Sequence, residues 1–316
     1  SDTATITGNN LILVGSTPGE DTKYIYNIGG IAGRISEDTT LVENLENSDT
    51  SLIGPNSESG SIWGINNDNS EFDLNVAVGA QVDNTIRMVN VGGTIGYVVS
   101  NADVKIVNIK NSADIITGYQ NVGGLIGYVG ENVTVENTIE FVPASNIEAG
   151  NQYYDSNYEL CIADGSEGEL YELSSNSVSS TGKVVGAVNV GGAFGHFEGD
   201  VASNIWTEAN VYGNASVGGF VGYINNANSV IDGNIVAKQN SSDTTIENEQ
   251  LLEVKGIYLA IGMSTIEYGI LQTGYEYYIP TSVGGFIGTA EAGTVQNNCV
   301  YDTNVLSTNE ADVLYD

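Results

Sequence analysis

One eight-residue pattern, in which apolar residues flank glycines, occurs six times along the chain. The copies are NIGGIAGR at 27–34, NVGGTIGY at 90–97, NVGGLIGY at 121–128, NVGGAFGH at 189–196, SVGGFVGY at 216–223 and SVGGFIGT at 282–289. Position two of this octet is always Ile or Val, and position six is always apolar. β-Branched residues are typical of buried strands. We therefore expect each octet to contribute strand to a buried core.

Position eight of the octet holds Arg, Tyr, His or Thr, which indicates a side chain that reaches water. In a flat strand, positions two, six and eight would face the same side. A bend or bulge at the intervening glycine resolves this conflict, because glycines in strands mark bulges or close backbone approach. The Gly-Gly pair is expected either to make a corner, through positive φ, or to let neighbouring backbones pack closely. In a stack of coils, the Asn or Ser at position one would form a ladder along one corner.

The spacing of the octets indicates a repeat. They start at 27, 90, 121, 189, 216 and 282, so the steps are 63, 31, 68, 27 and 66 residues. A unit of about 31 residues explains these steps if each long gap hides a degenerate copy, near 51–64, 146–165 and 256–270. Octets that are two copies apart start about 95 residues apart. The chain therefore also repeats, about three times, with a longer period of about 95 residues.

These patterns predict an all-β fold, a β-solenoid (β-helix-like) stack of Gly-rich repeats of about 31 residues. The threefold order leaves a pseudo-threefold β-prism-like fold as the alternative. The expected organisation is a cap or exchanged strand at 1–26, a repeat domain at 27–301 with insertions near 140–182 and 238–280, and a tail or cap at 302–316. Segments 243–256 and 37–47 are the two candidate helices.

The octet does not read as a nucleotide-binding loop. Its order is Gly-Gly-x-x-Gly, whereas the dinucleotide fingerprint is Gly-x-Gly-x-x-Gly, and the chain contains no phosphate-loop motif with Lys. Six nucleotide sites in one acidic chain would also make no chemical sense. The glycines are therefore interpreted as structural.

Charge narrows the choice of partners. The 316 residues include 40 acidic and 8 basic side chains, for a formal net charge of −32. This balance excludes nucleic acid as a partner, because phosphate binding needs clustered Lys and Arg. No segment approaches the roughly 20 apolar residues that span a bilayer.

The acidic balance also attracts cations, and Ca²⁺ is the one candidate cofactor. Two loop-like segments alternate carboxylates with small residues, although neither matches a known calcium loop, and solvated loops are the other interpretation. The candidate metal ligands are Asp68, Glu71, Asp73, Asp164, Glu167 and Glu169.

Candidate catalytic chemistry is scarce. His196 is the single histidine, and it occupies position eight of an octet, where Tyr, Arg or Thr stands elsewhere. The motifs of metalloproteases, serine hydrolases and dithiol redox enzymes are absent. We therefore expect a non-enzymatic protein with no catalytic residues. A carbohydrate-active enzyme that uses paired carboxylates is the remaining enzymatic alternative.

Two further features bear on the compartment. Cys161 and Cys299 either form one disulfide or remain two buried thiols. Asn132, Asn214 and Asn240 begin Asn-x-Ser/Thr sequons and are candidate glycosylation sites.

The octet and the strand that follows it resemble the GLUG repeat, which has the form Val-Gly-Gly-Leu-Val-Gly-Tyr, a short turn and a strand containing Asn-Cys. SVGGFIGTAEAGTVQNNCV at 282–300 is the fullest match, and six units over 27–301 share the resemblance. The resemblance implies a β-solenoid or similar stack in a secreted or cell-surface microbial protein. The repeat carries no catalytic residues.

Together these features predict an extracellular, cell-surface structural repeat protein that self-associates, by head-to-tail stacking or strand addition, into a filament or surface array. The alternative is an adhesin-like module that binds glycans or cell-surface proteins.

Overall fold

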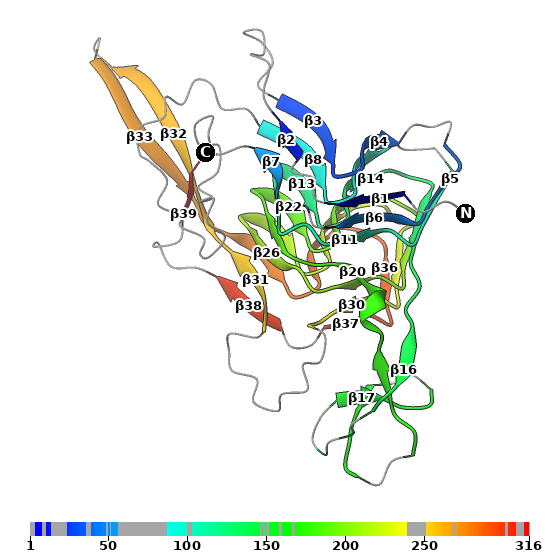
Figure 1. Ribbon diagram of the computed structural model, residues 1–316. Helices are drawn as coiled ribbons and strands as arrows, with labels where there is room; N and C mark the ends of the chain where they lie inside the picture. The colour runs from blue at the N-terminus through cyan, green and yellow to red at the C-terminus, as the bar shows by residue number, and fades with distance from the viewer. Residues whose placement is uncertain are drawn as a thin grey trace.

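Successive turns of the chain stack into an all-β solenoid in which the strands form five parallel sheets (Figure 1). This computed structural model describes residues 4–7, 11–13, 24–35, 39–48, 50, 52–55, 87–99, 103–145, 147, 149, 152–157, 160–165, 168–238, 251–267, 270–300, 303–307 and 313–315. Within these ranges the only helix is the short 3-10 helix η3 (Ser175–Ser177). None of the described segments is a helix long and apolar enough to cross a bilayer. The predicted all-β solenoid is confirmed.

We name the five sheets A to E in the order in which the chain visits them. Sheet A contains β1 (Ala4–Thr7), β6 (Leu45–Ser48), β11 (Lys110–Asn111), β20 (Val178–Ser180), β25 (Trp206–Thr207), β30 (Ile235–Val236) and β37 (Cys299–Val300). Sheet B contains β2 (Leu11–Leu13), β7 (Leu52–Pro55), β12 (Ile115–Thr117), β21 (Lys183–Val185), β26 (Asn210–Gly213), β31 (Leu252–Gly256) and β38 (Thr303–Ser307).

The other three sheets have six strands each. Sheet C contains β3 (Tyr24–Gly29), β8 (Arg87–Gly92), β13 (Gln120–Gly123), β22 (Val188–Gly191), β27 (Ala215–Gly218) and β34 (Thr281–Gly284). Sheet D contains β4 (Ala32–Ile35), β9 (Ile95–Val98), β14 (Ile126–Val129), β23 (Phe194–Phe197), β28 (Val221–Ile224) and β35 (Ile287–Ala290). Sheet E contains β5 (Leu41–Glu43), β10 (Val104–Val107), β15 (Val133–Glu136), β24 (Val201–Ser203), β29 (Val230–Asp232) and β36 (Thr294–Gln296).

The strand register corrects the interpretation of the long steps. Position-two residues of the octets pair directly across all three of them: Ile28 with Val91, Val122 with Val190, and Val217 with Val283. Octets on either side of a long step therefore lie on neighbouring coils, and the degenerate copies expected near 51–64, 146–165 and 256–270 do not exist as separate coils. The β-prism alternative is also wrong, because all six octets follow one another in a single linear stack.

The extra residues of two long steps leave the stack as antiparallel outgrowths (Figure 1). The first, between sheets E and A, contains β16 (Phe141–Pro143), β17 (Gln152–Tyr154), β18 (Leu160–Ile162) and β19 (Tyr171–Leu173). The second, between sheets B and C, is a long hairpin of β32 (Tyr258–Glu267) and β33 (Ile270–Tyr278), joined by β39 (Val313–Tyr315). Insertions are tolerated at these corners because the coil continues in register beyond them.

Both candidate helices are wrong wherever the chain is described. Residues 252–256 of the segment 243–256 form β31, and most of the segment 37–47 forms β5 and β6. Leu252 and Val254 are buried and alternate with half-exposed Glu253 and Lys255. This period of two identifies a strand, so pairing with neighbouring coils overrides the local preference of Glu and Lys for helix.

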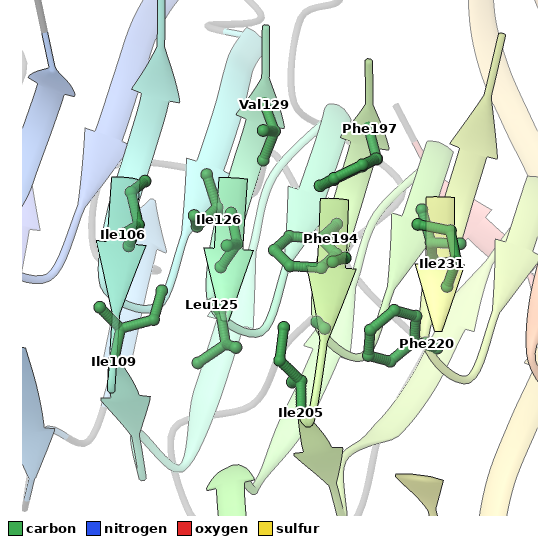
Figure 2. Close-up of a cluster of buried hydrophobic side chains, with 14 of the residues drawn as sticks. Ile106, Ile109, Leu125, Ile126, Val129, Phe194, Phe197, Ile205, Phe220 and Ile231 are labelled. Atoms are coloured by element: carbon green, nitrogen blue, oxygen red, sulfur yellow. The ribbon is translucent and has the colours of Figure 1, made fainter. Parts of the chain in front are cut away.

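Two hydrophobic clusters fill each coil, and they lie on opposite sides of sheets C and D. One cluster packs position two of the octets in sheet C against sheet B, as Val122 packs near Ile116 and Val184. The other packs position six in sheet D against sheet E and the adjoining corners, and it includes Ile126 and Phe194 (Figure 2). Positions two and six therefore both point inward, as predicted, but into different clusters.

Between these clusters, sheets C and D pack backbone against backbone through glycines at octet positions three and seven. A Cβ built on Gly127 would lie 2.5 Å from the carbonyl carbon of Asn90 and 2.6 Å from the backbone nitrogen of Val91. A Cβ on Gly123 would lie 2.8 Å from the backbone nitrogen of Gly195 on the next coil. Real Cβ atoms essentially never come this close. The glycines are needed because no side chain fits between the two strands of the arch.

The structure decides between the two roles proposed for the Gly-Gly pair. The chain does bend at octet positions four and five, between the strands of sheets C and D, but none of the octet glycines has a positive φ, so the corner is not made through that conformation. The close-packing role is confirmed. The left-handed residue is instead the Asn or Ser at position one, with φ of 53° at Asn121 and 54° at Ser216. Asparagine tolerates this conformation better than most residues, which explains its use at this position.

A gap in the pairing of sheet D at position seven resolves the predicted conflict between positions six and eight. Ile126 and Tyr128 pair with the neighbouring coils, while the intervening Gly127 has no partner in the register. Ile126 and Val129 are both fully buried in the same cluster, and Tyr128 between them remains partly exposed. The side-chain direction therefore shifts by one residue at position seven, in every paired coil alike, so the strands stay in register.

Candidate functional site

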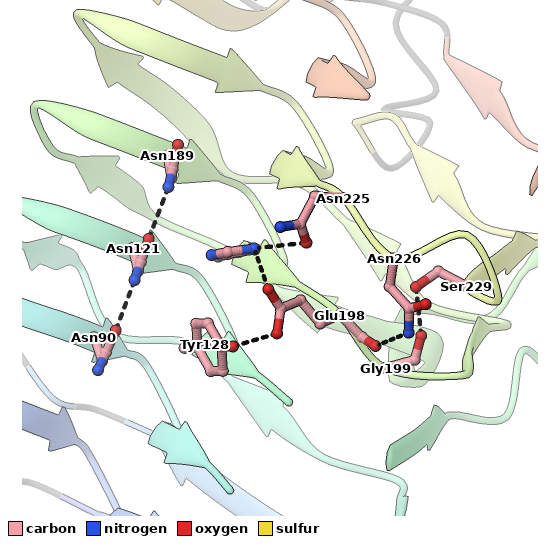
Figure 3. A network of polar contacts seen from close by, with 10 residues as sticks. Asn90, Asn121, Tyr128, Asn189, Glu198, Gly199, Asn225, Asn226 and Ser229 are labelled. Carbon is pink, nitrogen blue, oxygen red and sulfur yellow. Dashed lines mark hydrogen bonds and ion pairs between the residues drawn. The ribbon is translucent and has the colours of Figure 1, made fainter. Parts of the chain in front are cut away.

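The asparagines at position one of the first four octets form the predicted ladder along a corner of the stack (Figure 3), whereas Ser216 bonds Thr289 instead. Asn90 Nδ2 donates to Asn27 Oδ1 at 2.9 Å, Asn121 Nδ2 to Asn90 Oδ1 at 2.7 Å, and Asn189 Nδ2 to Asn121 Oδ1 at 2.9 Å. Asn90 and Asn121 thus each donate to one neighbouring coil and accept from the other. Such a chain fixes the register between coils, at a net gain of about 1 kcal/mol for each bond. The side-chain amides of this ladder bond to one another, so the ladder serves to hold neighbouring coils together.

Position eight forms a column of rings beside this ladder. Tyr97 stacks on Tyr128 with ring centroids 5.0 Å apart, while His196 meets Tyr128 and Tyr223 edge-on at 4.8 Å and 4.9 Å. A sugar ring binds an aromatic side chain over its face. Here neighbouring rings cover one another, so the column contributes to stability between coils and is a poor platform for carbohydrate.

His196 of this column lies beside Glu198, which follows it by two residues in the chain. His196 Nε2 lies 3.3 Å from Glu198 Oε1 and 3.2 Å from Asn225 Oδ1, and Tyr128 Oη donates to Glu198 Oε2. Burial lowers the pKa of His196 from its usual value, although Asn225 and Glu198 act in the opposite direction. The polar groups are directed at one another, so the arrangement reads as structural.

The lowered pKa of His196 predicts an acid-sensitive stack. The unfolded chain binds a proton at this histidine more readily than the folded chain, so the free energy of unfolding should fall as pH drops through about 6.5. The variant His196→Tyr restores the residue found at this position in three other coils and cannot titrate in this range. Chemical denaturation at pH 8.0 and pH 5.5 should show a larger loss for wild type than for His196→Tyr. An equal loss in both proteins would contradict the assignment.

The carboxylates proposed as metal ligands do not form a site among the described residues. Asp164 and Glu169 are exposed in the first outgrowth, whereas Asp68, Glu71, Asp73 and Glu167 lie outside the described residues. No group of three or more His, Cys, Asp or Glu side chains suited to a metal ion occurs in the described part of the chain. Calcium binding stays a prediction from the sequence.

The two cysteines are not joined in the structure. Cys161 in β18 and Cys299 in β37 are both half-buried thiols, and burial raises the pKa of Cys299. Of the two interpretations from the sequence, the structure contains the pair of thiols.

The sequons differ in accessibility. Asn132 is exposed, with a positive φ of 61°, and can accept a glycan sterically. Asn214 is only 5% exposed, and its Nδ2 donates to the carbonyl oxygens of Ile257 and Tyr278, both at 2.8 Å. Asn214 is therefore corrected to a structural residue in the folded chain. Asn240 lies outside the described residues.

One apolar surface is exposed at the C-terminal end of the stack. We number the coils by their octets, so that the fifth coil contains the octet 216–223 and the sixth the octet 282–289. Core residues of the fifth coil pair with exposed residues of the sixth. The pairs, with their exposed fractions, are Ile231 (0%) with Val295 (43%), Val236 (0%) with Val300 (40%), and Val254 (0%) with Val305 (48%). The sequence offers no sign of this exposure, since the exposed residues continue the same apolar pattern. It arises because no further coil covers them among the described residues.

The opposite end of the stack is open in the same way. Ala32, Ile35 and Val42 are partly exposed, while their partners Ile95, Val98 and Ile106 are fully buried. Within the described residues, the five sheets begin with β1 to β5 and end with β34 to β38. As far as the structure describes the chain, both ends therefore present apolar side chains together with unpaired strand edges.

Comparison with known proteins identified no relative of this chain. Neither protein-family models, nor curated proteins, nor solved structures gave a significant match to the chain.

Proposed function

We propose that this chain is a non-enzymatic structural repeat protein that associates end to end, as a subunit of a filament or surface array. The observation that carries this proposal is the open C-terminal end, where Val295, Val300 and Val305 are 40–48% exposed although their partners one coil earlier are fully buried. An extracellular location belongs to the proposal and rests on the resemblance to the GLUG repeat.

The strands at one end of the stack can pair with those at the other end of a second copy. Each end carries strands of the same five parallel sheets, visited in the same order. A second copy placed further along the stack axis can therefore present its first coil to the last coil of the copy before it. The contact is head-to-tail, so it leaves a free end on each side and extends into a filament when the rotation does not close a ring.

Apolar burial favours this contact. Burial of apolar surface contributes about 25 cal/mol per Å², and pairing of exposed strand edges adds main-chain hydrogen bonds. The formal charge of −32 opposes it by repulsion between copies. Salt screens that repulsion, with a Debye length of about 8 Å at 0.15 M and about 3 Å at 1 M. Association should therefore increase with salt.

The double variant Val295→Lys, Val305→Lys tests the open end. Two charges placed on the exposed core should weaken association, and light scattering should report a lower mean mass than for wild type at the same concentration and salt. Ala227→Lys is the matched control, because Ala227 is exposed on a turn at the side of the fifth coil. Electron microscopy of the same samples shows whether the assemblies are linear.

Two outcomes would overturn the proposal. One is a wild-type protein that stays monomeric at every salt and protein concentration tested. The other is a double variant with the same mass distribution as Ala227→Lys, since association would then use another surface.

A further inference from the structure

A cleft of about 390 Å³ lies where the first outgrowth meets the corner between sheets E and A. Phe141 and Tyr154 of the outgrowth line one wall, Ile235 of sheet A lines another, and Asn204, Gly233 and Asn297 belong to the corner itself. Its volume falls within the range of about 300–1,000 Å³ that is usual for small-molecule sites. The self-association proposed above rests on Val295, Val300 and Val305, none of which lines this cleft.

The aromatic wall is held in place by packing. Phe141 and Tyr154 meet edge to face with ring centroids 5.0 Å apart. Both belong to a cluster with Trp206 and Ile235, in which Trp206 is 1% exposed and its Nε1 donates to the carbonyl oxygen of Ala237 at 2.8 Å. The outgrowth is therefore fixed against sheet A, and the cleft is formed before any ligand arrives.

The corner beneath the cleft is a column of asparagines in which one coil has glycine instead, and all of them except Asn137 are left-handed. Asn44, Asn108, Asn204 and Asn297 have φ between 53° and 56°, and Gly233, with φ of 67°, occupies the same place on the coil between the last two. The glycine leaves the space above it unfilled. A Cβ built there would meet only Asn204 Oδ1, at an ordinary 3.4 Å.

Amide groups border this gap. Asn204 is exposed, and its side chain makes no hydrogen bond within the described part of the chain. Asn297 Nδ2 donates to Asp232 Oδ1 at 2.8 Å, which leaves its own carbonyl oxygen as an acceptor. The cleft thus offers donors and acceptors on one side and rings on the other.

The lining carries no charge, in a chain of formal net charge −32. Two other grooves of similar size in the described part of the chain differ in this respect: one is lined by Asp114, Lys183, Glu208 and Lys238, and the other by Glu46, Lys110 and Glu140. Asp232 is the carboxylate bonded beside the cleft, and its two oxygens accept from Gln296 and Asn297. An anionic or cationic ligand would find no counter-charge in the lining.

From this lining we infer that the cleft binds a neutral saccharide, with one sugar ring above Gly233, its hydroxyl groups on the amides of Asn204 and Asn297, and its apolar face toward Phe141. Amides complement the hydroxyl groups of an uncharged sugar, and aromatic rings complement its apolar C–H face. Burial of one ring with a few placed polar groups is the usual composition of such sites.

Gly233→Asn tests the site with little risk to the fold, because asparagine already occupies this left-handed position in four other coils. The full chain is applied to an array of neutral oligosaccharides (glucans, mannans, galactans and N-acetylhexosamine oligomers) beside sialylated, sulfated and uronate glycans. Wild type should bind members of the neutral set alone, and Gly233→Asn should lose that signal. Gly165→Asn is the matched control, because Gly165 also has a positive φ, of 86°, with open space around it.

Asn204→Ala gives a second measurement that does not depend on filling the gap. Titration calorimetry with the best neutral oligosaccharide should show binding about twofold to tenfold weaker than wild type, as expected for one hydrogen bond. The inference is overturned if no neutral glycan binds, if charged glycans alone bind, or if Gly233→Asn binds as well as Gly165→Asn. Light scattering of the same proteins reports end-to-end association separately, so either idea can fail without the other.

Discussion

Replacing Gly127 by alanine is expected to destabilise the stack by about 3 kcal/mol or more, at the upper end of what overpacking costs. The new Cβ would lie 2.5 Å from Asn90 C and 2.6 Å from both Val91 N and Gly96 O, all of which are backbone atoms. A flexible side chain could turn away, but a backbone held in two parallel sheets cannot. Sheets C and D would have to separate along the coils around the substitution.

Urea or guanidinium denaturation of wild type and Gly127→Ala measures this loss. Gly168→Ala is the control, because Gly168 has no positive φ and nothing lies within 4 Å of a Cβ built there. That variant should stay within about 0.5 kcal/mol of wild type, as is usual for exposed positions. Equal stability of the two variants would show that sheets C and D do not pack through their glycines.

Phe220→Ala is expected to cost about 3–5 kcal/mol, whereas Phe286→Ala at the same octet position one coil later should cost clearly less. Phe220 is fully buried, meets Phe194 edge-on at 5.5 Å, and stacks on Phe286 at 4.8 Å. Phe286 is partly exposed because no described coil covers its other face. Removal of Phe220 leaves a cavity inside the stack, while the space left by Phe286 opens to water.

The same two variants report on the proposed association. Denaturation under conditions where the protein is monomeric should give the unequal costs, and light scattering at high salt should show weaker association for Phe286→Ala. Similar costs for both variants in the monomer would mean that the terminal coil is covered from within the chain. That result would remove the main support for end-to-end association.

Much of the octet could be predicted from its six copies. The inward direction of positions two and six, the water-facing position eight, the bend at the glycine and the ladder of position-one residues are all confirmed. These features repeat in every coil, so comparison of the copies separates constrained positions from free ones without any relative of the chain. The solenoid follows because a unit of this length cannot bury its apolar face alone.

The errors came from features that do not repeat. The degenerate coil expected near 256–270 is instead a hairpin that leaves the stack between Gly256 and Thr281, within the segment 238–280 where an insertion is also expected. The cleft above Gly233 could not be recognised either, because its aromatic wall comes from an outgrowth more than 70 residues earlier in the chain. A period in sequence cannot distinguish an insertion from a decayed unit.

The sequence by itself therefore determined the kind of fold and the direction of side chains within each octet, because burial and backbone geometry act locally and identically in every coil. Only the tertiary structure decided which coils are neighbours, which strand faces which, and why glycine stands at positions three and seven. Those features depend on contacts between residues far apart in the chain. The glycines are required by the backbone of sheets C and D in neighbouring coils, and not by their own φ angles.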